Sequence, residues 1–245
     1  MITLLNRFDD KYVIKKEDIL EITSKYTRDN NLRTYLSDVV FSNEESSYDP
    51  ESQIINFNID AIEESNRRLF ERLRDTHQID EAYTSYYLNF YYLQTIYHLL
   101  AYVSQKANYQ DREDLVGYLY DLNSRLHVDP KTGLLLPMEI EANNTGILTA
   151  SKLLRCTKLP GKESTVMDLE YLKSLLLNYQ RRNNYQVTSP VEVLSSTFPI
   201  VDIDKINELL EQSKLSKTDR FNLGLPITTK EYDEVAKKLV KSKHN

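Results

Sequence analysis

Residues 83–107 constrain the fold of this chain more than any other stretch. Apolar and aromatic side chains surround a helix here on most sides, and ten of the 18 tyrosines of the chain fall between Tyr83 and Tyr120. A helix that is apolar nearly all the way round is normally buried in a core. The stretch therefore predicts a long, central, buried helix.

Two faces of this predicted helix differ in chemistry. One face is aromatic and polar, and the other is mainly aliphatic; the first holds Tyr87, Tyr91, Gln94, His98, Tyr102 and Gln105, and the second Leu88, Tyr92, Ile96, Leu99 and Val103. A buried tyrosine hydroxyl needs a hydrogen-bond partner, so the first face fits a core with internal polar contacts. Tyrosine is also frequent in interface hot spots, so Tyr87, Tyr91 and Tyr102 remain candidates for a binding surface.

The rest of the chain reads mainly as helix, with two short strands near the N-terminus. The strands are predicted in YLSDVVFS (35–42) and SQIINFN (52–58), with the acidic, turn-rich segment 43–51 as the loop between them. Helices are predicted from Ile14, from Asp60 with Glu63 as capping-box partner, over 111–126, at Pro137, after Thr165 and Asp168, at Ser189-Pro190 and from Thr228. We therefore expect one predominantly helical α+β domain over 1–245. Its parts are an N-terminal helix and strands (1–58), a helical core (59–185) and C-terminal helices (186–245).

Charge and cysteine content exclude several classes of protein. The formal net charge of −6 argues against direct nucleic-acid binding and fits a protein that binds basic surfaces. The single cysteine, Cys156, excludes an internal disulfide and any multi-cysteine metal site. No signal peptide or membrane-spanning run is visible, so we expect a cytoplasmic protein without membrane contact. The basic C-terminal end, with Lys237, Lys238, Lys241 and Lys243, leaves a nucleic-acid regulator as a weaker option.

Among the four histidines, His98 alone has a sequence context typical of a metal site. A His-Glu-x-x-His helix places two imidazoles one turn apart on one face, where they bind zinc. Here Leu99 follows His98, and Tyr102 stands four residues on. A lone core histidine is more often hydrogen-bonded than metal-bound, so the spacing by itself provides only one imidazole ligand.

Four stretches, taken in order, resemble zincin-like metalloprotease relatives found in Gram-positive bacteria, their phages and mobile elements. They are YDPESQIINFN, HLLAYVSQ, LLPMEIEANNTG and DRFNLGLPITTKEYDEV. The resemblance aligns His98 with the first zinc ligand, Leu99 with the general-base glutamate and Tyr102 with the second histidine. It also aligns Gln105 with a glutamine of the motif, Glu139 with a third ligand and Glu141 with the neighbouring acid. The resemblance implies a zincin-like helical core with a small N-terminal sheet.

The departures from this motif decide what function we expect. Leucine cannot take a proton from a zinc-bound water, and a tyrosine ligand would have to lose a proton whose pKa is about 10. His98 and Glu139 alone provide two ligands, whereas a catalytic zinc usually has three. We therefore expect no catalytic residue, cofactor or metal, and a degenerate site at His98, Tyr102 and Glu139.

Two function classes follow from the resemblance. The first is a non-catalytic, inhibitory or protein-binding pseudoenzyme encoded by a phage or mobile element. Its partner would present a basic surface, as a host CRISPR effector nuclease does along its nucleic-acid channel. The second is a divergent metal-dependent peptidase or hydrolase that uses His98, Tyr102 and Glu139.

Overall fold

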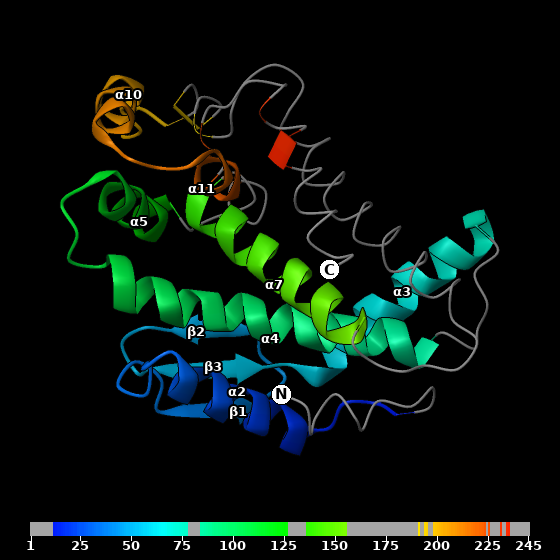
Figure 1. Cartoon of the computed structure of the whole chain (residues 1–245). Helices are drawn as coiled ribbons and strands as arrows, with labels where there is room; N and C mark the ends of the chain where they lie inside the picture. The colour runs from blue at the N-terminus through cyan, green and yellow to red at the C-terminus, as the bar shows by residue number, and fades with distance from the viewer. Residues whose placement is uncertain are drawn as a thin grey trace. The chain divides into compact units, whose positions relative to one another are not determined.

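The computed structural model describes residues 12–77, 84–126, 136–155 and 198–223, together with Val191, Leu194, Ser195, Leu225, Glu231, Glu234 and Val235 (Figure 1). The helices are α2 (Lys16–Asp29), α3 (Ile59–His77), α4 (Thr84–Tyr109), α5 (Leu115–Leu126), α7 (Pro137–Arg155), α10 (Ile203–Gln212) and α11 (Lys217–Asn222). The strands are β1 (Asp38–Phe41), β2 (Ser47–Asp49) and β3 (Ile54–Phe57). The predicted class, predominantly helical α+β with a small sheet, is confirmed.

The sheet has the strand order β1-β3-β2, with β1 parallel and β2 antiparallel to β3. Both predicted strands are confirmed, but the prediction of a plain loop over 43–51 is wrong because this segment contains β2. The sequence of β2, Ser-Tyr-Asp, has no apolar alternation that would reveal a strand. Gln53 adopts a left-handed conformation, with φ of 60°, where the chain turns from β2 into β3.

Helix α3 begins two residues after the end of β3, and its cap differs from the predicted one. The Asn58 side chain accepts a hydrogen bond from the Ala61 amide at 2.9 Å, which is the contact of an N-cap residue. The helix predicted from Asp60 is confirmed and begins at Ile59, but the predicted capping box of Asp60 and Glu63 is wrong. Glu63 instead accepts a hydrogen bond from the Tyr92 hydroxyl of α4 at 2.8 Å.

Contacts divide the chain into two compact units, Met1–Ala107 with Thr145–Ser174, and Asn108–Asn144 with Leu175–Asn245. In the first unit, α4 supplies much of the core, and the Phe57 ring of β3 stacks on Tyr92 at 6.3 Å. Tyr26 of α2 packs edge-on against Tyr97 at 5.8 Å. The predicted buried helix is thus confirmed over 84–107, while residue 83 lies outside the described residues.

The second unit has its own apolar core, built around α5. Leu115, Leu119 and Leu122 of α5 are buried with Met138 of α7 and Ile206 of α10. The helix predicted at Pro137 begins there, as proline at the first helical position allows. The helix starts predicted at Thr165, Asp168, Ser189-Pro190 and Thr228 lie outside the described residues.

Candidate functional site on helix α4

Two of the predicted site residues, His98 and Tyr102 of α4, are in contact with each other. His98 Nε2 lies 2.8 Å from the Tyr102 hydroxyl, and the two rings meet edge to face with centroids 4.7 Å apart. Both residues are half-buried, and they stand four residues apart on one helical face. Tyr102, which the resemblance aligns with a second histidine, therefore contacts a ring nitrogen of His98.

The residue after His98 belongs to the core. Leu99 is 1% exposed, and Leu100 beside it is fully buried. A carboxylate at position 99 would lose its hydration and find itself among apolar side chains. Leu99, which the resemblance aligns with a general-base glutamate, therefore packs in the core.

Helix α7 approaches this part of α4 closely at Gly146. A Cβ atom on Gly146 would lie 2.4 Å from the Gln94 carbonyl oxygen and 3.3 Å from His98 Cβ. Any other residue would force the two helices apart, so the lack of a side chain permits this approach. This contact is not predicted from the sequence, although a glycine inside a helical pattern often has a packing reason.

The other residues of the aromatic face have mixed environments. Gln105 is buried at 3% exposure, while Tyr91 is half-buried and packs edge-on against Phe90 at 6.0 Å. The side chain of Tyr87 lies outside the described residues. Of the three proposed surface tyrosines, Tyr91 and Tyr102 are thus partly enclosed.

The two predicted acids of α7 lie in the second unit, whereas His98 and Tyr102 lie in the first. Glu139 is buried at 7% exposure in the first turn of α7, where the helix dipole stabilises a carboxylate. Glu141 accepts a hydrogen bond from the Tyr109 hydroxyl at 3.0 Å. Burial and the charge of Glu141 both raise the pKa of Tyr109 above its usual range.

Further polar contacts anchor α4, and sequence reasoning missed them. Buried Asn89 accepts from the Ile14 amide at 2.8 Å and donates to the Tyr12 carbonyl at 2.7 Å. The Tyr86 hydroxyl donates to the Leu154 carbonyl of α7 at 3.0 Å. An asparagine inside an apolar helical stretch was the one available signal, because a buried amide must be hydrogen-bonded.

Neither a metal-binding cluster nor a membrane-spanning helix occurs among the described residues. In those parts of the chain, no group of three or more His, Cys, Asp or Glu residues is arranged to hold a metal ion. None of the helices described there combines the length and apolarity needed to cross a bilayer.

Comparison with known proteins found no match to this chain among family models, curated proteins or solved structures.

Proposed function

We propose that this chain is a non-catalytic protein-binding protein whose scaffold is related to that of zincin-like metalloproteases. The observation that carries the proposal is the contact between His98 Nε2 and the Tyr102 hydroxyl at 2.8 Å. If the hydroxyl donates, the lone pair of Nε2 is engaged; if Nε2 carries the proton, it has no lone pair for a metal. In either tautomer, zinc binding through Nε2 would first have to break this hydrogen bond.

Burial of Leu99 supports the same proposal. A metalloprotease needs a carboxylate next to the metal-bound water. Here the aligned residue is Leu99, whose side chain is enclosed in the core at 1% exposure. A leucine in place of glutamate at position 99 stabilises the packing of the helix, and it also removes the proton acceptor. We infer that the scaffold was kept for its surface.

The partner that we propose is a protein with a basic surface, and the chain would act by blocking or redirecting it. The net charge of −6 supports this choice. A host nuclease such as a CRISPR effector has a positively charged channel of the required kind. Such a role suits a protein encoded by a phage or mobile element.

The test combines affinity capture with an activity assay on the full chain. Tagged protein is incubated with lysate of candidate hosts, and captured proteins are identified by mass spectrometry, with and without a zinc chelator. We expect one stoichiometric basic partner, retained in chelator. Zinc-dependent peptide hydrolysis that His98→Ala abolishes would overturn the proposal and favour the divergent hydrolase using His98, Tyr102 and Glu139.

A further inference from the structure

Negative charge is concentrated in one segment of the chain. No lysine or arginine occurs between Arg33 and Arg67, and this segment contains eight acidic residues: Asp38, Glu44, Glu45, Asp49, Glu51, Asp60, Glu63 and Glu64. The rest of the chain contains all 31 basic residues and the other 29 of the 37 acidic residues, so its charges nearly balance. The sheet and the start of α3 therefore carry the acidic character of the whole chain.

The two faces of the sheet have different surroundings. On one face, Val39, Ile55 and Phe57 are buried against the core of the first unit. The opposite face, here called the outer sheet face, consists of Asp38, Val40, Ser47, Asp49, Ile54 and Asn56. Four of these six are exposed, with Ile54 and Asn56 half-buried.

Strand register places apolar and acidic groups of this face side by side. Ile54 of the central strand lies between Asp38 and Asp49, and Asn56 lies between Val40 and Ser47. Val40 is 39% exposed and is one of three exposed large hydrophobic residues in the described part of the chain. An apolar pair bordered by carboxylates is the pattern of an interface centre with a charged rim.

The charged form of Asp49 on this face is stabilised by a neighbouring hydroxyl. A hydrogen bond from the Ser52 hydroxyl, at 2.5 Å, is the largest cause that lowers the pKa of Asp49. Glu44 and Glu45 are exposed on the connection between β1 and β2 and extend the acidic rim. Nucleic acid would be repelled here, whereas a lysine- or arginine-rich segment would be attracted.

We propose that the outer sheet face is the docking surface for a basic segment of a partner protein, with Val40 and Ile54 as its apolar centre. This inference rests on the proposed binding function and assigns it to a surface. Lysine or arginine side chains of the partner lie against Asp38, Asp49, Glu44 and Glu45, and their aliphatic stems cover the two apolar residues.

The test uses a fluorescein-labelled peptide of alternating lysine and valine, with a glutamate–valine peptide as its counterpart. Binding to the full chain is measured by fluorescence anisotropy at low and high salt. We expect the lysine peptide alone to bind, and Glu44→Gln/Glu45→Gln to weaken it about three- to tenfold at low salt. The matched control, Asp111→Asn/Glu113→Gln, removes two exposed acids in the second unit and should leave binding unchanged.

The apolar centre is tested separately with Val40→Ser, which should also weaken binding about three- to tenfold. Its control is Ile200→Ser, which changes an exposed hydrophobic residue of the second unit. The residues changed in all four variants are exposed, and thermal melts check that each variant remains folded.

Three results would overturn the inference. The first is that the lysine peptide does not bind, and the second is that the sheet variants and their controls weaken binding equally. The third is a concentration-dependent dimer that Val40→Ser dissociates, because a second copy of the chain would then cover the outer sheet face. Zinc content and peptide hydrolysis are measured on the same samples. If the chain is a hydrolase, these two measurements detect zinc and peptide hydrolysis, and the proposed function fails. If only the assigned surface is wrong, the two measurements show neither.

Discussion

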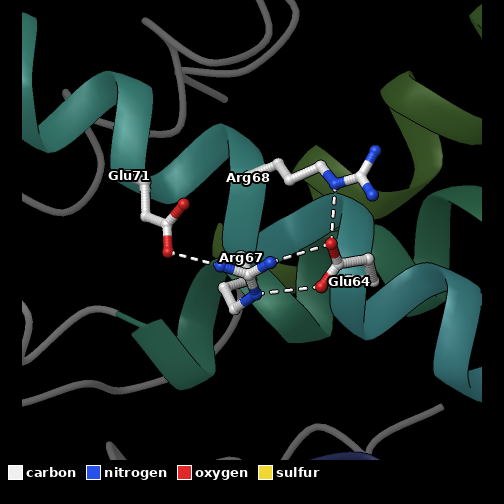
Figure 2. A network of polar contacts seen from close by, with 4 residues as sticks. All are labelled: Glu64, Arg67, Arg68 and Glu71. Atoms are coloured by element: carbon white, nitrogen blue, oxygen red, sulfur yellow. Dashed lines mark hydrogen bonds and ion pairs between the residues drawn. The ribbon is translucent and has the colours of Figure 1, made fainter.

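Helices α3 and α4 follow one another in the chain and use polar side chains in opposite ways. On α3, Arg67 contacts Glu64 at 2.8 Å and Glu71 at 2.6 Å, and Arg68 contacts Glu64 at 2.6 Å, all at the surface (Figure 2). On α4, nearly all described side chains are buried or half-buried, and Tyr86, Asn89 and Tyr92 form hydrogen bonds with other elements of the fold. The ion pairs of Arg67 and Arg68 are thus within α3, whereas hydrogen bonds of Tyr86, Asn89 and Tyr92 connect α4 to other elements.

The physical setting explains this difference. Exposed ion pairs gain little, because water and salt screen both charges. Hydrogen bonds from the two arginines lower the pKa of Glu64 to about 2, yet its side chain stays 41% exposed. A buried polar group that loses its partner has no water to replace it, so the hydrogen bonds of buried Tyr86 and Asn89 are costly to break.

The largest effect is expected from Leu99→Glu combined with Tyr102→His. A buried carboxylate without a partner costs on the order of 3–5 kcal/mol, so the metal-free variant should melt well below the unaltered protein. With His98 and a new imidazole one turn apart and an acid beside them, zinc should bind and recover part of that loss. Melting temperature and zinc stoichiometry, with and without metal, measure both effects. A folded variant that takes up no zinc would count against the alignment of His98 with a metal ligand.

Gly146→Ala should have the next largest effect. The new methyl group would overlap the Gln94 carbonyl of α4, so we expect a loss of about 1–3 kcal/mol in the free energy of unfolding. Denaturant unfolding measures it, with Lys152→Ala on the exposed side of α7 as control. Equal stability of the two variants would show that the helices are not in close contact at Gly146.

Alkaline pH should weaken the packing between α2 and α4. Burial raises the pKa of Tyr97 to about 12, above its usual value, so the neutral form is favoured in the folded state. This contribution is fully present below pH 10 and is lost as the pH rises from 10 towards 12. Unfolding free energy should fall by on the order of 1–2 kcal/mol in that window, and by less in Tyr97→Phe. Identical pH profiles for the two proteins would show that the pKa of Tyr97 is not raised in the folded state.

The smallest effect is expected on α3. Arg67→Ala removes contacts to Glu64 and Glu71, all of them solvent-exposed. We expect a change in melting temperature within experimental error, and none at high salt. A large loss of stability would erase the contrast between the two helices.

Periodicity in the sequence predicted α2, α4 and the start of α7 because each has a strong pattern or a proline signal. It missed β2, which is three residues long and polar, and it placed the α3 cap at Asp60 because Asn58 reads equally well as the end of a strand. Helix α10 was also missed, although Asp202 caps it through the Lys205 amide at 3.0 Å.

For the candidate site, sequence spacing placed His98 and Tyr102 on one face, and the structure joins them. The contact of α7 with α4 at Gly146 depends on tertiary packing between distant segments, which no local pattern encodes. The charge gap between Arg33 and Arg67 was readable from the sequence, but its meaning depended on which sheet face is buried.

The most direct test of the central claim is the zinc content of the unaltered protein. Native mass spectrometry and elemental analysis are carried out on the unaltered chain, purified without chelator and then supplied with equimolar zinc. Since Tyr102 engages His98 Nε2, we predict no stoichiometric zinc and no difference between the unaltered protein and His98→Ala. One zinc per chain that disappears in His98→Ala would contradict the account.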